Sequence, residues 1–534
     1  MATKINKTAE QKIMPEIAAV VTWLNALAPD QVLRLETDSR QVQPGDVFFA
    51  YPVGAGDGRN YIKQAVELGA VGVIYEAQDF VSNSDLRIPC LAVSDLLRQS
   101  GFIASAYLKQ PDAGMTVMAV TGTNGKTSCT NWLARAVSQL GTQACVIGTL
   151  GIATVKSGTV AEFDVTGFTT PDAIQLHQKI AAQRALGTVA IAIEASSIGI
   201  EQGRLNGMHV DIAVFTNLTR DHLDFHGDMA NYEVAKRKLF AWPDLKAAVV
   251  NLDDAAGMRL AQFGLERGVQ VLGYGVDQPQ EKILNDGALK SDSTGGNAQI
   301  AVLNARNLRN YQGGTSFQLD SPFGNGVVKT QMIGRFNVSN ILAVLATLFA
   351  SGVVWRDAIH AVEQLTPVAG RMEQLSAAGR VLVIIDYAHT PDALEKTLIN
   401  LQEVARDRQG KLWCVFGCGG DRDPGKRPEM GKIAELADEI IITSDNPRSE
   451  NPEQIMAQIA AGFSGDRKPA AMREPDRAKA ILFAIKNAAK NDVVLLAGKG
   501  HEAYQEIKGK KLMFSDIDHA NIALADLATK GAGL

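Results

Sequence analysis

The stretch VMAVTGTNGKTSCT, residues 117–130, combines glycine, lysine and hydroxyl side chains as phosphate-binding loops do. The common form of such a loop is Gly, four residues, then Gly-Lys-Ser/Thr. Here Val120 stands at the first glycine position, and Gly122 follows two residues later. An apolar stretch precedes the loop and a helical pattern follows it, which is the order that a phosphate site requires. The sequence therefore predicts an ATP-type phosphate site; the alternative is a turn that contains Gly-Lys-Thr by chance.

The chemistry of this loop follows from its residue types. Backbone N–H groups of the loop and of the following helix attract phosphate oxygens. Lys126 can reach the β- and γ-phosphates, and Thr127 can offer its hydroxyl to Mg²⁺. The predicted nucleotide-binding residues of the loop are Gly122, Thr123, Asn124, Gly125, Lys126, Thr127 and Ser128.

Further polar residues follow two other predicted strands. Glu194 ends the apolar run VAIAIE, where a carboxylate beside a phosphate loop suits a Mg²⁺ ligand; the alternative is a helix-capping turn. His222 lies next to Asp221 in TRDHLDFHG and is a candidate ligand for a second cation; the alternative is a polar surface loop. Lys236 follows on a predicted helix, where a lysine is normally solvated.

Length and composition limit the class of protein. The 534 residues predict three or four domains at about 150 residues per domain, and 46% hydrophobic residues suffice for packed cores. A net charge of −5 argues against nucleic-acid binding. Five scattered cysteines without a CxxC pair are typical of reduced thiols. No apolar run approaches the ~20 residues that span a bilayer, and the N-terminal stretch resembles an amphipathic helix rather than a signal peptide. We therefore expect a cytoplasmic protein without membrane partners.

Three segments follow one another along the chain. Residues 1–112 contain TDSRQVQPGDVFFAY and a helix–strand pattern. Residues 113–366 alternate short apolar strands with helices, which predicts a mostly parallel sheet covered on both faces. A polar insert at 277–299 is expected to be an exposed loop or irregular hairpin. Residues 367–534 repeat the alternation in VLVIIDYA, LWCVFGCGG, EIIITSDN and DVVLLAGKG. Because ligands bind outside the carboxyl ends of strands in such sheets, we expect the chemistry at these strand exits.

An ordered set of motifs resembles the Mur ligase family, the ATP-dependent amino-acid ligases of peptidoglycan synthesis. The motifs are TGTNGKT, TTPD, EASSIGIEQGR, TNLTRDHLDFHG, YEVAKRKLF, GRFNVSN, GRME, DYAHTPD and DNPR. They cover nearly the whole chain and are most similar to the members that add the third peptide residue. The loop of this family reads TGTNGKT, which accounts for Val120. Ile198 departs from the pattern, since many relatives have histidine there.

The resemblance implies an α/β fold of three domains. These are an N-terminal domain for the uridine nucleotide, a central P-loop-type ATP domain with a parallel sheet, and a C-terminal Rossmann-like domain for the incoming amino acid. The implied reaction joins an amino acid to UDP-N-acetylmuramoyl-L-alanyl-D-glutamate through an acyl phosphate, with ATP and Mg²⁺ as cofactors. Carbamylation of Lys236 by CO₂ is also implied. The implied catalytic residues are Lys126, His222 and Lys236, and the implied metal ligands are Thr127, Glu194, His222 and Lys236.

The resemblance assigns the remaining contacts by motif. The adenine side is assigned to Asn337, Asn340, Arg371, Asp386 and His389. The uridine diphosphate is assigned to Thr37, Ser39, Gly54, Ala55 and Gly56. The sugar and its dipeptide are assigned to Thr169, Thr170, Ser196, Gln202 and Arg204. The incoming amino acid is assigned to Arg422, Asp445, Asn446, Pro447, Arg448, Gly498 and Glu502.

Two of these assignments have structural alternatives. TTPD is also typical of a helix start with Thr170 as N-cap. DNPR is also typical of a turn in which Arg448 pairs with Glu450 on the surface.

The resemblance also implies the choice of amino acid, because in this family the loop reads the incoming amino acid and DNPR resembles the version of the members that add meso-diaminopimelate. meso-Diaminopimelate differs from lysine by a second carboxylate, which Arg448 can bind in a planar, bidentate way. We therefore expect diaminopimelate as the substrate of a monomeric enzyme with small-molecule partners only. The alternatives are a lysine-adding ligase, a folylpolyglutamate synthetase-like ligase, or a P-loop switch or transport ATPase that needs no amine acceptor.

Overall fold

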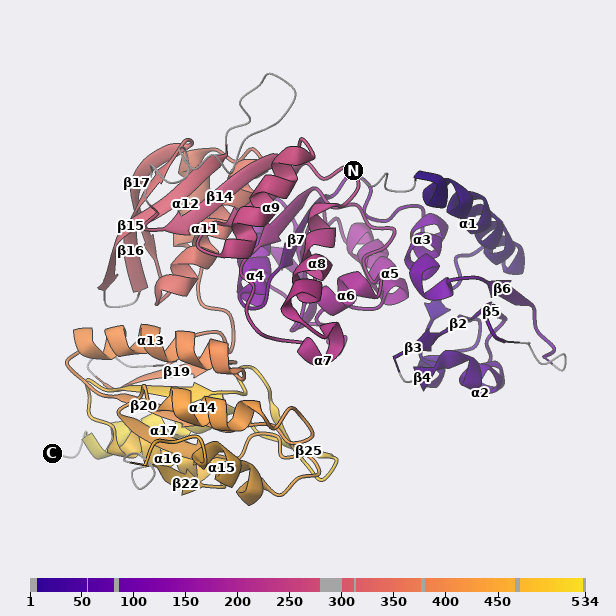
Figure 1. Cartoon of the computed structure of the whole chain (residues 1–534). Helices are drawn as coiled ribbons and strands as arrows, with labels where there is room; N and C mark the ends of the chain where they lie inside the picture. Colours follow the sequence, from indigo (N-terminus) through magenta and orange to yellow (C-terminus); the bar gives the residue numbers. More distant parts are fainter. Residues whose placement is uncertain are drawn as a thin grey trace.

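The computed structural model describes residues 7–54, 56–80, 86–278, 300–311, 314–375, 380–465 and 471–531, with side chains omitted for 7–16 and 528–530. Ala55 and residues 279–299 of the polar insert lie outside the described residues. Three α/β units follow one another along the chain (Figure 1), each with its own parallel-stranded sheet. The predicted fold class is confirmed.

The N-terminal unit is built on a small parallel sheet with the order β1-β2-β5-β6. Alternate side chains of its strands point to opposite faces, so Phe49 packs under α1 and α3 while Phe48 packs under α2. The elements are α1 (Lys7–Leu27), β1 (Leu35–Glu36), β2 (Val47–Ala50), β3 (Pro52–Val53), β4 (Gly56–Asp57), α2 (Ile62–Glu67), β5 (Gly72–Glu76), β6 (Cys90–Val93) and α3 (Leu96–Tyr107).

The central unit contains an 11-stranded sheet with the order β10-β9-β8-β11-β7-β12-β13-β14-β15-β16-β17. The strands from β8 to β15 are parallel, as predicted, but β9–β10 and β16–β17 add antiparallel edges that we did not predict. The strands are β7 (Thr116–Thr121), β8 (Ala144–Gly148), β9 (Gly151–Lys156), β10 (Thr159–Val160), β11 (Ala190–Glu194), β12 (Ile212–Phe215), β13 (Ala247–Asn251), β14 (Gln270–Val276), β15 (Ala301–Tyr311), β16 (Gly314–Ser321) and β17 (Gly324–Thr330).

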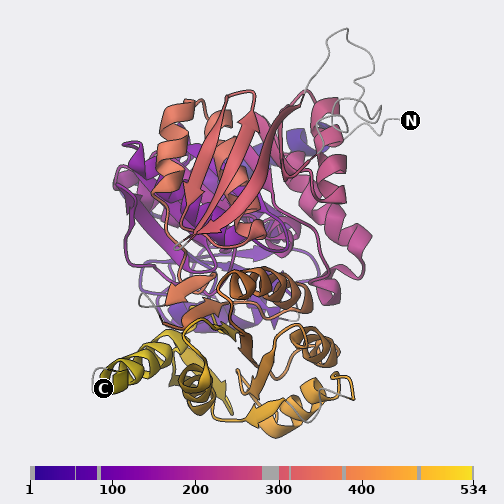
Figure 2. The same cartoon turned by 90° about the vertical axis from the view of Figure 1, so that its left-hand side faces the viewer.

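Helices cover both faces of this sheet, as the short apolar strands predicted (Figure 2). Met118 and Val120 of β7 face one layer, and Val117 and Ala119 face the other. The first layer contains α4 (Lys126–Gln139), the buried helix α11 (Arg335–Ala350) and α12 (Trp355–Glu363). The other layer contains α5 (Ala173–Ala185), α8 (Met229–Phe240) and α9 (Ala255–Glu266), beside the short helices α6 (Ser197–Glu201) and α7 (Leu223–His226).

The C-terminal unit has a six-stranded sheet with the order β18-β19-β23-β20-β21-β22. All four predicted strands are present, whereas β18, β22 and the hairpin β24–β25 were not predicted. The elements are β18 (Glu373–Leu375), β19 (Leu382–Asp386), α13 (Pro391–Asp407), β20 (Leu412–Phe416), α14 (Lys426–Ala434), β21 (Glu439–Thr443), α15 (Pro452–Ala460), β22 (Met472–Glu474), α16 (Arg477–Asn487), β23 (Val493–Ala497), β24 (Tyr504–Ile507), β25 (Lys510–Met513) and α17 (Asp516–Gly531).

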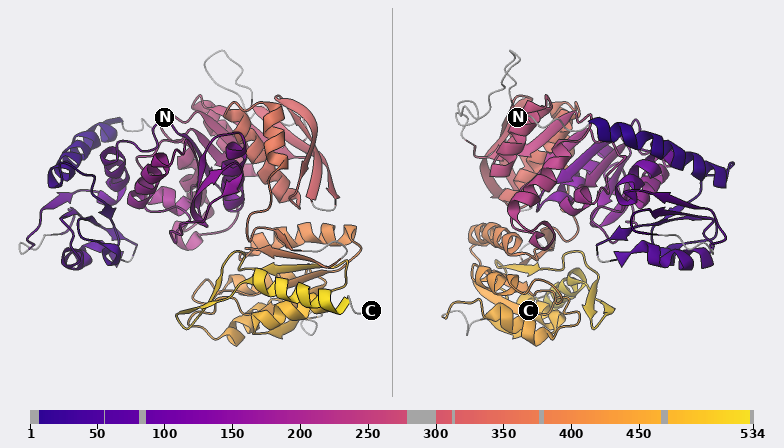
Figure 3. Two further views of the ribbon diagram at one scale, coloured as in Figure 1. Left: turned by 180° about the vertical axis from the view of Figure 1, so that it is seen from behind. Right: turned by 45° about the vertical axis from the view of Figure 1, so that its right-hand side comes forward.

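The three units lie next to one another in the ribbon views (Figure 3), and specific hydrogen bonds join them. From the C-terminal unit, Asn400 of α13 accepts a 2.8 Å hydrogen bond from the backbone N–H of Arg335, at the start of α11. From the N-terminal unit, Leu35 exchanges two backbone hydrogen bonds with the Gln178 side chain of α5. The predicted boundaries after residues 112 and 366 stay predictions. Among the described helices, none has the length and apolarity that a bilayer crossing requires.

The topology places the carboxyl ends of several neighbouring parallel strands side by side. The chain leaves β7 for β8 on one side of it and later adds β12 on the other, with β11 between β8 and β7. The strand order therefore reverses at β7, which is the position where open α/β sheets bind ligands. The segments that follow β7, β8, β11 and β12 meet at these carboxyl ends and form the site described below.

The C-terminal unit depends on one fully buried ion pair. Arg477, at the start of α16, donates to both carboxylate oxygens of Asp516, at the start of α17, over 2.7 and 2.6 Å. Both side chains are 0% exposed. A charge that loses its partner at such depth is strongly destabilising, whereas removing both charges costs much less.

We expect Asp516→Ala to destabilise the C-terminal unit by about 3–5 kcal/mol, because it leaves the Arg477 guanidinium unpaired. Hydrogen exchange of the β20 and β23 amides measures this loss within the unit. The double variant Arg477→Met/Asp516→Leu should recover most of it. A loss below about 1 kcal/mol for Asp516→Ala would contradict the prediction.

Candidate active site

The loop between β7 and α4 is shaped by two glycines. Gly122 has φ +145° and Gly125 has φ +88°. A Cβ on Gly122 would lie 1.9 Å from Thr216 Oγ1, and a Cβ on Gly125 would lie 2.5 Å from Asn340 Oδ1. Val120, by contrast, is still inside β7 and fully buried. A side chain is therefore required at this first position, because the turn begins only at Gly122.

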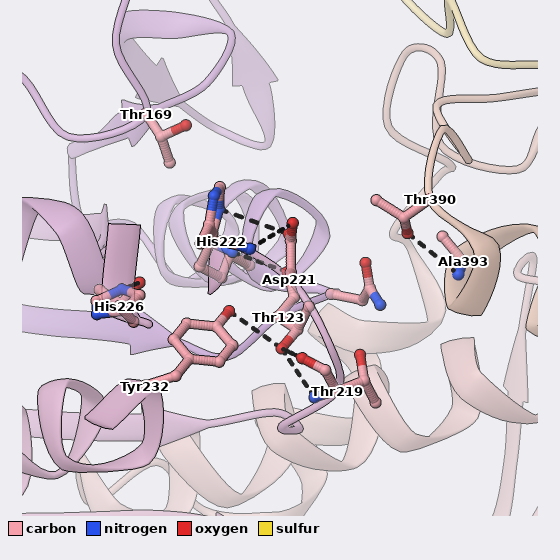
Figure 4. Close-up of polar contacts among 12 residues, drawn as sticks. Thr123, Thr169, Thr219, Asp221, His222, His226, Tyr232, Thr390 and Ala393 are labelled. Carbon is pink, nitrogen blue, oxygen red and sulfur yellow. Dashed lines mark hydrogen bonds and ion pairs between the residues drawn. The ribbon is translucent and has the colours of Figure 1, made fainter. Parts of the chain in front are cut away.

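Hydrogen bonds from the exit of β12 hold the loop in place. Asn217 accepts from the N–H of Asn124 over 2.9 Å and donates to its carbonyl over 3.0 Å. Thr216 Oγ1 donates to the same carbonyl over 2.6 Å. The hydroxyl of Thr123 accepts from the N–H of Thr219 over 3.0 Å and lies 3.2 Å from the hydroxyl of Tyr232 (Figure 4). Side chains from the exit of β12 therefore hold the loop backbone in this conformation.

Among the described residues, no carboxylate lies within hydrogen-bond distance of Lys126. Its Nζ donates to the carbonyls of Gly122 and Thr123, each over 2.9 Å. Burial lowers the pKa of Lys126, and the carboxylates of Glu194 and Asp221 oppose this shift. Within the described part of the chain the ammonium donates only to carbonyls of the loop itself, so a phosphate oxygen can replace these weaker partners.

Glu194 lies at the carboxyl end of β11 and is 1% exposed. Its carboxylate accepts from the N–H of Thr149 over 2.8 Å and from the Thr149 hydroxyl over 3.2 Å. Thr149 follows β8, so a neighbouring strand exit sets the orientation of Glu194. Both residues line the same cleft as Thr127.

The donor set fits a magnesium ion that arrives with a nucleotide. Among the described residues, no group of three or more His, Cys, Asp or Glu side chains forms a ready metal site. Mg²⁺ is commonly held by one or two carboxylates together with phosphate oxygens and water. The hydroxyl of Thr127 and the carboxylate of Glu194 meet that requirement.

His222 is the N-cap residue that precedes α7, and its backbone lies in the left-handed region with φ +52°. Its Nε2 lies 3.5 Å from Asp221 Oδ2, and the side chain is 44% exposed toward the cleft that both residues line. Burial of the ring lowers the pKa of His222, so the imidazole is neutral near pH 7. A neutral imidazole is the form that binds metal ions.

Lys236 is not on a solvated helix face, contrary to the structural alternative from the sequence. Its side chain is 1% exposed, and its Nζ lies 4.2 Å from the centre of the Tyr232 ring. It makes no hydrogen bond or ion pair with any described residue. Burial lowers the pKa of Lys236 well below its ordinary value, and the charge of Lys126 lowers it further. The side chain is therefore an amine that can lose its proton.

One cleft of about 620 Å³ brings most of the predicted nucleotide residues together. It lies between the carboxyl ends of the central strands and the first turns of α13. Thr390, which lines the cleft, accepts a hydrogen bond from the N–H of Ala393 at the start of α13 (Figure 4). The predicted residues that line it are Thr123, Asn124, Gly125, Lys126, Thr127, Ser128, Thr169, Glu194, His222, Asn337, Asn340, Arg371, Asp386 and His389.

Within this cleft, two residues assigned to the adenine side lie at the phosphate loop. Arg371 Nη2 is 3.3 Å from Thr127 Oγ1, and its guanidinium stacks on the Tyr387 ring at 4.6 Å. Asn340 contacts Gly125, as described above. Asn337 is buried and donates to the carbonyl of Ile333 over 3.0 Å.

Asp386 and His389 have mainly local partners. Asp386 accepts from the N–H groups of Met372 and Ala388 over 2.8 and 3.0 Å, and burial raises its pKa. The ring of His389 lies 2.8 Å from the carbonyl of Tyr387. Both residues shape the turn that follows β19.

Several site residues escaped the sequence analysis. Asp392 accepts from Asn124 Nδ2 over 2.8 Å and from the Thr219 hydroxyl over 2.9 Å, so it joins the phosphate loop to α13. It belongs to the DYAHTPD motif. Thr149 follows the apolar strand β8 directly, and Asn217 lies two residues after the end of β12. The same strand-exit signal that identified Glu194 would have found them.

The residues assigned to the sugar form one cluster beside β11. The fully buried Thr170 donates to the carbonyl of Glu194 over 2.7 Å and lies 2.9 Å from Ser196 Oγ. Arg204 donates to the carbonyl of Thr170 over 2.8 Å and to Gln202 over 2.7 Å.

The N-cap of α5 is not Thr170. Asp172 caps the helix by accepting from the N–H of Gln175, so the sequence-based cap was wrong. Thr170 instead stabilises the turn after β11 through its hydrogen bonds to the carbonyl of Glu194 and to Ser196.

The residues assigned to the uridine nucleotide lie in the N-terminal unit and do not line the 620 Å³ cleft. Ser39 is buried and contacts Gln64 Oε1 at 2.9 Å, while the N–H of Thr37 donates to Glu36. Gly54 has φ +58° and Gly56 belongs to β4. Ala55 lies between them, outside the described residues.

The DNPR loop follows β21 and holds Arg448 differently from the predicted surface turn. Arg448 Nε donates to Glu506 over 3.1 Å, and Nη1 donates to the carbonyl of Gly420 over 2.7 Å. Glu450 pairs with Arg427 instead, over 2.8 Å to each carboxylate oxygen. The predicted Arg448–Glu450 pair was therefore wrong. Arg422 is exposed and makes no hydrogen bond or ion pair with the described residues.

The other predicted amino-acid contacts lie beside this loop. Asn446 donates to Glu502 Oε2 over 2.9 Å, and Pro447 follows it in the turn. Gly498 has φ +111°, and a Cβ there would lie 2.6 Å from Asp445 Oδ2. The group does not line the 620 Å³ cleft and forms a separate polar patch at the strand exits of the C-terminal sheet.

Lys126→Ala should lower the rate of ATP turnover by at least ~10²–10³-fold, because the developing phosphate charge loses its cation. The melting temperature should stay within a few degrees, since Lys126 contacts only loop carbonyls. Lys179→Ala removes an exposed lysine paired with Asp164 and serves as the control. Near-normal turnover by Lys126→Ala would contradict the phosphate-site assignment.

Comparison with known proteins gives a consistent result along the whole chain. The Mur ligase family catalytic domain matches residues 32–106, the Mur ligase middle domain matches 120–348, and the Mur ligase glutamate ligase domain matches 370–500. The chain is 53% identical over 516 residues to UDP-N-acetylmuramoyl-L-alanyl-D-glutamate--2,6-diaminopimelate ligase of Janthinobacterium sp. (strain Marseille), which covers 97% of this chain and 98% of the relative. The enzyme of that name from Pseudomonas aeruginosa is 43% identical, with 94% and 98% covered.

Solved structures agree with the fold. A structure of UDP-N-acetylmuramoyl-L-alanyl-D-glutamate--2,6-diaminopimelate ligase has a TM-score of 0.63 and 33% identity, and covers 95% of this chain and 99% of that one. Folylpolyglutamate synthase of Mycobacterium tuberculosis has a TM-score of 0.56 at 17% identity, covers 76% of this chain and 92% of that one, and is similar in fold alone. The phosphate loop, the strand-exit residues and these full-length similarities together show that the chain belongs to the Mur ligase family.

Proposed function

We propose that this chain is an ATP-dependent ligase that joins meso-diaminopimelate to UDP-N-acetylmuramoyl-L-alanyl-D-glutamate and releases ADP and phosphate. One observation supports this most strongly: a single cleft unites the phosphate loop, Glu194 and His222 with α13 of the unit that carries DNPR. Full-length similarity to ligases of that name supports the same conclusion. The enzyme works on small molecules as a cytoplasmic monomer.

The reaction has two stages. A substrate carboxylate attacks the γ-phosphorus of ATP, the bond to the bridging oxygen breaks, and ADP leaves. The amine of the amino acid then attacks the acyl phosphate, and the tetrahedral intermediate expels phosphate and loses a proton. Both partners of the first step are anions, so fixed positive charge must stabilise their approach.

This chain supplies that charge from named positions. Lys126 neutralises the transferring phosphoryl group, and Arg371 lies beside Thr127 to assist it. Thr127 and Glu194 would hold Mg²⁺, which when bound adds positive charge to the phosphates. The other N–H groups of the loop can orient the nucleotide, because Asn217 holds the backbone of the loop at Asn124.

The nucleotide sugar binds the N-terminal unit and extends toward Thr169. The assigned uridine contacts, Thr37, Ser39 and Gly54 to Gly56, all belong to that unit. Arg204 stacks on the Phe168 ring at 4.7 Å and donates to the carbonyl of Thr170, so it offers a cation beside this part of the site.

Lys236 supports the carbamate that the resemblance implies. Formation of a carbamate requires an unprotonated amine, which attacks CO₂ and releases a proton. The buried, partnerless Nζ with its lowered pKa meets this requirement. The new carboxylate would turn a cation into an anion beside His222 and so allow a second Mg²⁺ to bind there.

Lys236→Ala should therefore be nearly inactive and should recover part of its activity when short carboxylates such as acetate or propionate are added. Lys238→Ala is the matched control, because Lys238 lies on the same helix but is 48% exposed and paired with Glu201. The control should stay active and should not respond to carboxylates. ¹³C NMR with labelled bicarbonate detects the carbamate directly, and a wild-type spectrum without it under turnover conditions would refute the proposal.

Arg448 accounts for the choice of amino acid. Glu506 and Gly420 hold its Nε and Nη1, whereas Nη2 has no partner among the described residues. The guanidinium is thus oriented but keeps donors for the distal carboxylate of diaminopimelate. Arg422 adds a second unpaired cation for the other carboxylate. Lysine lacks the distal carboxylate, so bound lysine would leave the free donors of Arg448 without a partner.

Arg448→Ala should lower kcat/KM for meso-diaminopimelate by ~10²-fold or more and change kcat/KM for L-lysine little, because a site built to pair a charged group rejects substrates that lack it. The measurement is kcat/KM for both amino acids in both proteins, with Arg473→Ala, an exposed arginine of β22, as control. A wild type that uses L-lysine equally well would overturn the specificity but leave the ligase reaction intact.

A further inference from the structure

Lys499 is a buried lysine in the amino-acid part of the site to which no role has been given above. It follows Gly498 at the end of β23, and its side chain is 0% exposed. A buried ammonium requires partners, and three acceptors surround this one. Its Nζ lies 3.0 Å from Glu502 Oε2, 3.2 Å from Asn446 Oδ1 and 3.6 Å from Asp445 Oδ1.

The first consequence is a fixed orientation for Glu502. Its Oε2 accepts from both Lys499 and Asn446 Nδ2, whereas its Oε1 has no hydrogen bond among the described residues. Glu502 therefore presents one free carboxylate oxygen in a set direction. An oxygen of that kind suits an ammonium group of an incoming amino acid.

The second consequence reaches Arg448. Asn446 Oδ1 accepts from Lys499 and also from the N–H of Glu506 over 2.9 Å. Glu506 in turn accepts from Arg448 Nε through its carboxylate and from the N–H of Arg448 through its carbonyl. One buried ammonium thus connects the acidic and the basic end of the proposed amino-acid site.

Lys499 cannot itself touch a ligand, because it is fully enclosed and its protons face protein acceptors. Stability alone is also a weak reason for its presence, since buried ion pairs can often be replaced by apolar side chains at little cost. The effect of Lys499 on ligand binding must therefore pass through the residues that it orients.

We infer that Lys499 is a positioning residue, which fixes Glu502 and, through Asn446 and Glu506, Arg448 before the amino acid arrives. The inference rests on the proposed function, in that these residues bind the incoming amino acid. It predicts a defect confined to one of the three substrates.

The test compares wild type with Lys499→Met by measuring kcat and KM for ATP, the nucleotide dipeptide and meso-diaminopimelate. KM for the amino acid should rise on the order of 10-fold or more, while the other two KM values change less than about 2-fold. Arg408→Met is the matched control: its cation donates to the carbonyls of Asn491 and Arg380 at the opposite end of the same sheet. The control should leave all three KM values near wild type, even with a lower melting temperature.

A double-mutant cycle separates positioning from general support. If Lys499 acts in part through Glu502, then the loss in Lys499→Met/Glu502→Gln should be clearly smaller than the sum of the two single losses, expressed as free energies. Additive losses, or KM values that rise together for all three substrates, would overturn the inference. If Lys499→Met does not fold, Lys499→Gln keeps a polar side chain and should show the same selective rise in smaller size.

Failure of the proposed function is distinguishable from failure of this inference. If the wild type does not use meso-diaminopimelate but uses another amino acid, the proposed substrate is wrong. The same KM comparison with that amino acid then decides the role of Lys499.

Discussion

The site depends on the contact between the phosphate loop and the exit of β12. Asn217 and Thr216 hold Asn124 from one side, and Asp392 of α13 holds its side chain from the other. The loop is thus part of the interface between the central unit and the C-terminal unit. Because the strand order reverses at β7, this interface lies where Glu194 and His222 also leave their strands. The proposed reaction brings a substrate carboxylate and the γ-phosphate of ATP together at this interface, where Lys126 and Arg371 supply positive charge.

The fold was predictable because its signals are local and repeated. Short apolar strands such as AIAIE and LWCVF are buried on both faces, so a parallel sheet between helices follows directly. The antiparallel strands β16 and β17 and the hairpin β24–β25 were missed because their side chains alternate between core and solvent or lie at the edge of a sheet. Their register depends on partners that are distant in the sequence.

Site residues were predictable where a motif combines chemistry with a strand exit. Lys126 and Glu194 follow this rule, and both line the cleft. The pairing of side chains was not predictable. Arg448 pairs with Glu506 and not with Glu450, and Lys236 is enclosed on a helix whose sequence resembles a solvated one. Such choices depend on tertiary packing, and only coordinates reveal them.

The most direct test of the central claim is phosphate release from ATP by the full-length chain with each substrate omitted in turn. The account predicts that release requires both UDP-N-acetylmuramoyl-L-alanyl-D-glutamate and meso-diaminopimelate, with one phosphate formed per new amide bond. Sustained release with ATP alone, or release without an amine acceptor at the full rate, would contradict it and would indicate a P-loop hydrolase instead.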